Sequence, residues 1–159
     1  MIITPISPAD EPAVLTLNNL HARELSWLEA DRLHHLIGQA FYARRVGALD
    51  AFIFAFDQSA DYDSPNFLWF RNRYARFVYV DRIAVAAHAR GRGIARAIYQ
   101  DLFTQASAHG HDVATCEVNA DPPNPESDAF HARLGFAAVG TAVIQGADKS
   151  VAYFARQLP

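Results

Sequence analysis

Apolar side chains recur at the three-and-four spacing of a helix in four stretches of the chain. The first follows Ser7 and Pro8, a capping serine and a proline suited to the first helical position. The second follows Ser26 and Glu29, which form a capping box. We therefore expect helices from Pro8 to Leu20, from a cap at Ser26 to Phe41, over 91–109, and from a cap at Asn124 to a stop at Gly135.

Short aromatic and β-branched runs alternate with these helices. Two of them, 51–56 and 77–85, are apolar on both faces and predict central strands, and 113–119 predicts a third. From Phe136 the pattern alternates with period two, which predicts a hairpin that turns near 145–149 and returns through Ala155. Only 58–66 has the composition of a long loop. This order of elements predicts a mixed α/β sheet.

Composition narrows the class of protein. With 159 residues, 51% of them hydrophobic, and no linker, we expect a single domain over 1–159. Net charge is −3, which disfavours a general nucleic-acid binder. The single cysteine, Cys116, excludes an intrachain disulfide and a zinc site built from several thiolates. Without a signal sequence or a membrane-length apolar run, a cytoplasmic protein with no membrane contact is expected.

The most informative segment, residues 88–96, lies between the strand at 77–85 and the helix that follows it; we call it the glycine–arginine loop. Gly91, Gly93 and Ala95 let a ligand approach the backbone, where the first N–H groups of a helix favour an anion. Arg96 stands where a dinucleotide fingerprint needs a third glycine, and Ile94 where a Walker A loop needs lysine. A phosphate site is predicted; the alternative is an ordinary helix entry with solvated arginines.

Three blocks of residues resemble the GNAT family of N-acetyltransferases. Arg90-x-x-Gly93-x-Ala95 is similar to its (Gln/Arg)-x-x-Gly-x-(Gly/Ala) signature, and Tyr79–Val85 is similar to its central strand. Asn124, His131 and the Gly135-Phe136 pair resemble its second signature. The resemblance covers the whole chain at fold level. It implies a mixed, mostly antiparallel sheet with splayed central parallel strands flanked by helices, and a cofactor-binding core at about 77–136.

The same resemblance implies binding of acetyl-CoA, with no metal. The loop would hold the pyrophosphate, and the backbone at the end of the central strand would hold the pantetheine arm. The implied contacts are Ile83, Ala84, Val85, Arg90, Gly91, Arg92, Gly93, Ile94, Ala95, Arg96, Asn119, Asn124, Ser127 and Phe130.

One position departs from the family pattern. His131 stands where the family commonly has a tyrosine that protonates the leaving thiolate. With an ordinary pKa of ~6.5, a histidine is able to supply that proton. The alternative is a helix-surface histidine that bonds to water.

Transfer of an acetyl group to an amine also needs a base, because an alkyl amine arrives mostly protonated. Asp81 and Glu117 interrupt apolar strands and are the candidates; for each the alternative is a salt bridge, for instance with Arg82, Arg71 or Arg73. Period two places Tyr79, Asp81 and Ile83 on one strand face. An acyl-cysteine route through Cys116 is disfavoured, since no activating histidine adjoins it.

Aromatic and acidic residues around the first two helices and the long loop suit a cationic acceptor, although several are equally suited to the core. The substrate-binding candidates are Asn19, Trp27, Tyr62, Asp63 and Tyr79. We expect an acyl-CoA-dependent N-acyltransferase that moves an acetyl group to a primary amine, on a small molecule or a peptide, by direct attack. A non-catalytic acyl-CoA sensor is the alternative, a nucleotide- or RNA-binding domain is disfavoured, and homodimer formation stays open.

Overall fold

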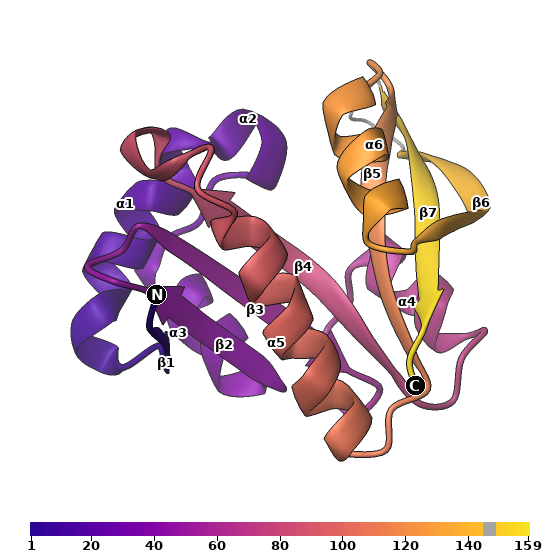
Figure 1. Ribbon diagram of the computed structural model, residues 1–159, viewed down its shortest axis with the longest axis horizontal. Helices are drawn as coiled ribbons and strands as arrows, with labels where there is room; N and C mark the ends of the chain where they lie inside the picture. The colour runs from indigo at the N-terminus through magenta and orange to yellow at the C-terminus, as the bar shows by residue number, and fades with distance from the viewer. Residues whose placement is uncertain (145–148) are drawn as a thin grey trace.

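A seven-stranded sheet runs through the computed structural model, which describes residues 1–144 and 149–159 (Figure 1). The strand order is β1-β2-β3-β4-β5-β7-β6, and every neighbouring pair is antiparallel except β4 and β5. The strands are β1 (Ile3–Pro5), β2 (Tyr42–Val46), β3 (Ala51–Asp57), β4 (Phe77–Val85), β5 (Val113–Asp121), β6 (Ala137–Ile144) and β7 (Lys149–Gln157).

Helices cover both faces of this sheet, which separates two apolar cores. The helical segments are η1 (Pro8–Asp10), α1 (Glu11–Leu20), α2 (Ala22–Leu25), α3 (Ala30–Gln39), α4 (Pro65–Arg71), η2 (Ala87–Ala89), α5 (Ile94–Ala108) and α6 (Pro125–Arg133). One core lies beneath α1, α3 and α4 and contains Leu33, Phe67 and Phe70. The other lies beneath α5 and contains Ile98 and Leu102. The fold is the mixed α/β sheet with flanking helices that the sequence predicts.

The strongly periodic elements lie where the sequence places them, with two differences at helix starts. Helix α3 begins at Ala30 with Glu29 as its N-cap, and Ser26 has φ 71°, so the expected cap at Ser26 is wrong. Helix α5 begins at Ile94, three residues later than expected, because Gly91 and Gly93 have φ of 76° and 73°. Residues with left-handed φ cannot continue a right-handed helix.

Four short elements carry no sequence signal strong enough to predict them. Strands β1 and β2 form one edge of the sheet, and α2 and α4 lie in stretches expected to be loop or undetermined. Their three to seven residues are too few to show a period, so tertiary contacts decide their structure. The predicted hairpin is confirmed as β6 and β7; most of its expected turn lies outside the described residues.

The two parallel strands share only a short register. Phe77 pairs with Val113, and the pairing ends at Tyr79 and Thr115. In Figure 1, β4 and β5 meet near their starts and then diverge, with α5 packed beside β4 and α6 beside β5. This is the predicted splay of the central strands. The facing edges of β4 and β5 beyond Tyr79 are therefore not joined by ladder hydrogen bonds.

A β-bulge shifts the alternation of β4 at Asp81. Phe54 of β3 pairs with Arg82, whereas Ala55 pairs with Val80, so Asp81 has no partner on β3. The extra residue reverses the alternation after it. Ala84 consequently joins the core beneath α1, and Ile83 packs with the core beneath α5. The expectation that Ile83 shares a face with Tyr79 and Asp81 is wrong for this reason.

Candidate active site

The splay of β4 and β5 opens into a cavity of about 470 Å³. Such a volume is within the usual range for a small-molecule site. Nine of the sequence-predicted site residues line it: Tyr62, Tyr79, Asp81, Ile83, Glu117, Asn119, Asn124, Ser127 and His131. The cavity therefore brings together all three candidate catalytic side chains.

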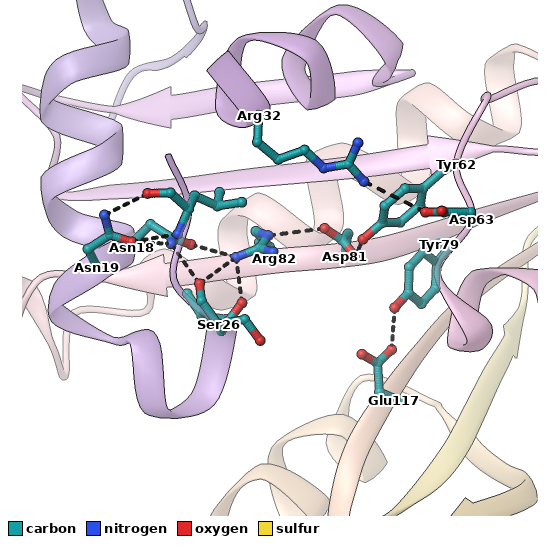
Figure 2. A network of polar contacts seen from close by, with 12 residues as sticks. Asn18, Asn19, Ser26, Arg32, Tyr62, Asp63, Tyr79, Asp81, Arg82 and Glu117 are labelled. Carbon is teal, nitrogen blue, oxygen red and sulfur yellow. Dashed lines mark hydrogen bonds and ion pairs between the residues drawn. The ribbon is translucent and has the colours of Figure 1, made fainter. Parts of the chain in front are cut away.

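Glu117 projects into the cavity from β5, where it accepts a hydrogen bond from the Tyr79 hydroxyl at 2.7 Å (Figure 2). Burial raises the pKa of Glu117 to about 7, against the opposing effect of the Tyr79 hydrogen bond. Across the described part of the chain, no cation pairs with this carboxylate. A carboxylate whose pKa lies near neutrality is suited to accept and release a proton.

Asp81, on the opposite wall, has a different environment. Its Oδ2 pairs with Arg82 Nε at 3.2 Å and its Oδ1 accepts from the Tyr62 hydroxyl at 2.8 Å (Figure 2). Burial raises the pKa of Asp81, while the guanidinium and the phenol favour its ionised form. The bulge makes this pairing of neighbours feasible, because it lets both side chains reach the same side of the sheet. For Asp81 the salt-bridge alternative is thus realised.

Arg82 ties the segment after α1 to the central strand. Its Nη1 donates to Asn18 Oδ1 at 3.0 Å, to the backbone oxygen of Ser26 at 2.9 Å, and to the backbone oxygen of Leu25. The Arg82 side chain is only 10% exposed, so these acceptors and Asp81 are needed to compensate its charge. Because Leu25 and Ser26 line the cavity, Arg82 fixes one of its walls.

His131 lies in α6 and is almost fully buried. Its Nδ1 lies 2.7 Å from the backbone oxygen of Ser127, and its Nε2 lies 3.0 Å from the Tyr99 hydroxyl. A carbonyl oxygen only accepts, so Nδ1 carries the hydrogen, and Nε2 of the neutral ring accepts from Tyr99. Burial lowers the pKa of His131, which favours this neutral form.

The glycine–arginine loop joins η2 to α5. Its left-handed Gly91 and Gly93 flank Arg92, a backbone pattern typical of anion-binding turns, and α5 adds its positive end. Arg90, Arg92 and Arg96 are exposed around this turn. Arg90 donates to His21 Nε2 at 3.0 Å, and Arg92 pairs with Asp50 at 3.2 Å. The arrangement is suited to a pyrophosphate, but none of the loop's residues lines the cavity itself.

The remaining predicted contacts divide between the cavity and its surroundings. Asn124 caps α6, accepting from the Ser127 N–H at 3.2 Å, and both residues line the cavity. Phe130 packs on Tyr99 outside the cavity lining, and Ala84 and Val85 belong to the two cores.

Among the predicted acceptor residues, Tyr62 and Tyr79 line the cavity and the other three do not. Asn19 braces the backbone of Leu28, with its amide donating to Leu28 O at 3.0 Å. Trp27 is 63% exposed and donates to Glu29. Asp63 has a side chain 96% exposed and pairs loosely with Arg32 at 3.8 Å.

Three polar residues that line the cavity are not among the site residues that the sequence predicts: Tyr99, Asn66 and Arg82. Tyr99 lies on the apolar stripe of α5, where the sequence pattern predicts a core residue. Asn66 ends the stretch expected to be a loop, yet it accepts from the Tyr153 hydroxyl at 2.7 Å and its amide favours ionised Glu117. For Arg82 the sequence suggests only a salt bridge. The one signal in the sequence is a charged residue within an apolar strand, and Arg82 shows this signal as well as Asp81.

In 1–144 and 149–159, no helix is both long and apolar enough to cross a membrane. The same residues contain no cluster of three or more histidine, cysteine or acidic side chains placed to hold a metal ion.

The chain matches one family model among known proteins. Residues 19–136 match the family model described as the acetyltransferase (GNAT) family. No curated protein sequence matches this chain at a significant level.

Several solved structures share the fold. The ribosomal-protein-S18-alanine N-acetyltransferase from Escherichia coli has a TM-score of 0.72 at 16% identity, over 99% of this chain and 93% of that one. The ribosomal-protein-alanine N-acetyltransferase from Brucella melitensis has a TM-score of 0.72 at 20% identity, over 99% and 100%. The NatC complex bound to Gag peptide and CoA has a TM-score of 0.75 at 13% identity, over 99% and 98%.

Proposed function

The chain belongs to the GNAT acetyltransferase family, and from this we propose that it transfers an acetyl group from acetyl-CoA to a primary amine by direct attack. The observation that carries the proposal is the position of Glu117. A carboxylate with a pKa of about 7 faces the cavity between the splayed strands and has no paired cation among the described residues. A sensor that only binds acyl-CoA needs no such group.

For the cofactor we propose the glycine–arginine loop as the pyrophosphate site. The left-handed Gly91 and Gly93, the start of α5 and three exposed arginines support this assignment. Asn119, Asn124 and Ser127 line the cavity on the β5 and α6 side, which supports their proposed contact with the pantetheine arm. The edge of β4 beyond Tyr79, which makes no ladder bonds to β5, offers backbone groups from Ile83 onward.

Glu117 and Asp81 have separate roles in the proposed reaction. Glu117 takes one proton from the incoming ammonium group, and the neutral amine attacks the thioester carbon. As the carbon–nitrogen bond forms and the carbon–sulfur bond breaks, the nitrogen loses a second proton to solvent in the cavity and CoA leaves as its thiol. Asp81, whose ionised form Arg82 and Tyr62 favour against burial, presents its carboxylate on the opposite wall and attracts the cationic acceptor. The Tyr62 and Tyr79 hydroxyls hold the two carboxylates in place.

Direct attack is preferred to an acyl-cysteine route. Cys116 is buried, and burial raises the pKa of its thiol, which keeps it protonated and weakly nucleophilic. For the acceptor, the names of the similar structures mention ribosomal-protein alanine and a peptide, which supports a peptide amine beside a small one. The two cavity carboxylates suit either.

The proposal is tested by mixing the protein with acetyl-CoA and a panel of amines, including short peptides with free N-termini and small diamines. Thiol release and the mass of the acetylated amine are measured together, and calorimetry with CoA reports binding separately. We expect at least one amine to gain one acetyl group for each thiol released. CoA binding without acetylation of any amine would favour the sensor instead.

A further inference from the structure

The departing thiolate needs a proton, and His131 is not free to deliver one directly. Its only ring hydrogen in the neutral state is committed to the Ser127 backbone oxygen, at 2.7 Å. Its other nitrogen is occupied by the Tyr99 hydroxyl, at 3.0 Å. The hydroxyl of Tyr99 is therefore the group of this pair whose hydrogen can be redirected, by rotation about the C–O bond.

Tyr99 comes from a different element and reaches the same end of the cavity. It lies in α5, about 9 Å along the helix axis from the Gly93 cap at a rise of 1.5 Å per residue. Along with Asn124, Ser127 and His131, it lines the cavity on the side where α5 and α6 flank the diverging strands. A thioester that extended from the glycine–arginine loop into the splay would enter the cavity that Tyr99 lines.

We propose that Tyr99 is the immediate proton donor to the departing thiolate and that His131 is the positioning residue that resupplies Tyr99. This inference rests on the proposed acetyl transfer. When the carbon–sulfur bond breaks, the Tyr99 hydrogen passes to sulfur, and the Nε2 hydrogen of protonated His131 passes to the Tyr99 oxygen. Tyr99 ends as a neutral phenol and His131 as a neutral imidazole, still bonded to Ser127 through Nδ1.

The relay is favoured over Tyr99 acting alone. A phenol ordinarily has a pKa of ~10 and a thiol one of ~8.5, so a tyrosinate left behind would make the transfer unfavourable, and burial raises the pKa of Tyr99 further. With protonated His131 behind it, the net transfer runs from an imidazolium, whose pKa burial lowers, to a thiolate, which is downhill. The resting ring is neutral, so the relay acts after His131 has taken up a proton at Nε2.

The surroundings of His131 keep this pair together. Phe130, Phe136 and Phe154 contact its ring, with centroids 5.3, 5.4 and 6.3 Å away. The ionisable groups that act on the pair are Asp128 from α6 and Cys116 and Glu117 from β5. Asp128 favours the protonated imidazole, while aromatic burial opposes it. Proton exchange with solvent then runs through the cavity.

A double-mutant cycle tests the relay. Tyr99→Phe, His131→Phe and the double variant are compared in single-turnover thiol release, using the best amine of the panel. We expect each single variant to lose roughly 10²-fold and the double variant no more, because either change breaks the same relay. Tyr42→Phe is the matched control: Tyr42 is equally buried and bonds Asp101 on α5, but does not line the cavity.

Nitrogen chemical shifts of the His131 ring give a readout that does not need activity. We expect the Nδ1–H tautomer in the wild type, and a changed Nε2 shift in Tyr99→Phe with Tyr42→Phe unchanged. A wild-type Nε2–H tautomer, or an active protein whose Tyr99→Phe variant keeps its rate within twofold, overturns the relay alone. A wild type that acetylates no amine overturns the proposed function, and the donor role with it.

Discussion

Two carboxylates share one cavity in this protein, and their neighbours give them different properties. Asp81 has a guanidinium at 3.2 Å and a phenol at 2.8 Å, which stabilise its charge. Glu117 has the Tyr79 hydroxyl and the Asn66 amide, both neutral. Neutral donors offset burial less than a cation does, so the pKa of Glu117 rises to about 7. This contrast is the basis for giving the two residues separate roles.

The raised pKa of Glu117 has a cost in stability that depends on pH. Between its ordinary value of 4.5 and about 7 the folded state binds the proton more tightly than the unfolded state, so stability falls as pH rises through this window. At about 1.4 kcal/mol per pKa unit, the cost above pH 7 is roughly 3 kcal/mol. Glu117→Gln removes it. Urea denaturation should show the variant more stable than wild type at pH 8 and equal to it near pH 4; equal stability at both would contradict the raised pKa.

Asp81 is expected to act in binding the acceptor rather than in proton transfer. Asp81→Asn keeps the shape and a partner for Tyr62 but removes the charge opposite Glu117. We expect the KM for the cationic amine to rise about tenfold, with kcat reduced less, in steady-state assays. Asp63→Asn is the matched control, because Asp63 is 96% exposed and does not line the cavity. A kcat loss with unchanged KM would instead make Asp81 the base.

The elements recovered from sequence are those whose own pattern is long enough to identify them. Helix α5 repeats its apolar stripe over 15 residues, and β4 is apolar on both faces because helices cover both. The bulge at Asp81 has no such signature, since it depends on how β3 pairs with β4. As a consequence the acids at 81 and 117 were found, but the assignment of Ile83 to their face was wrong.

The contacts between distant segments were also beyond prediction. Arg82 reaches Asn18 and Ser26 from 64 and 56 positions away, and Tyr99 meets His131 across 32. The periodic pattern of apolar residues within one element carries no information about such pairs. Sequence alone therefore supplied the candidates for base and acid, while the partners that distinguish Asp81 from Glu117 and Tyr99 from His131 required the fold.

The glycine–arginine loop yields a test of the pyrophosphate site. A Cβ at Gly93 would meet no atom within 4 Å, so Gly93→Ala changes the backbone preference without a clash. Because φ there is 73°, the variant should cost about 1–2 kcal/mol locally, and we expect at least tenfold weaker CoA binding by calorimetry. Gly38→Ala is the control: its Cβ also has free space, and α3 gives it no positive φ. Equal CoA affinity in both variants would place the pyrophosphate elsewhere.

The sheet as a unit supplies what neither the loop nor the acids supply alone. Pairing of β4 with β5 ends at Tyr79 and Thr115, so the sheet continues as two halves that face each other across the cavity. One half carries the glycine–arginine loop, Asp81 and the segment held by Arg82. The other carries Glu117 and α6. The proposed reaction requires both halves, since the amine must lie between the two carboxylates while the thioester reaches it from the loop.

The decisive measurement is a single-turnover reaction of acetyl-CoA with a reactive amine from the panel, followed by mass spectrometry from pH 6 to 9, for the wild type and Glu117→Gln. We expect the wild-type rate of amide formation to rise with pH as Glu117 ionises, with its pKa of about 7, and to fall at higher pH, where the relay lacks protonated His131. The variant should be roughly 10²- to 10⁴-fold slower at low pH and recover part of the loss where the amine is neutral. Equal rates and equal pH profiles in the two proteins would contradict the account, because amine activation would then not depend on Glu117.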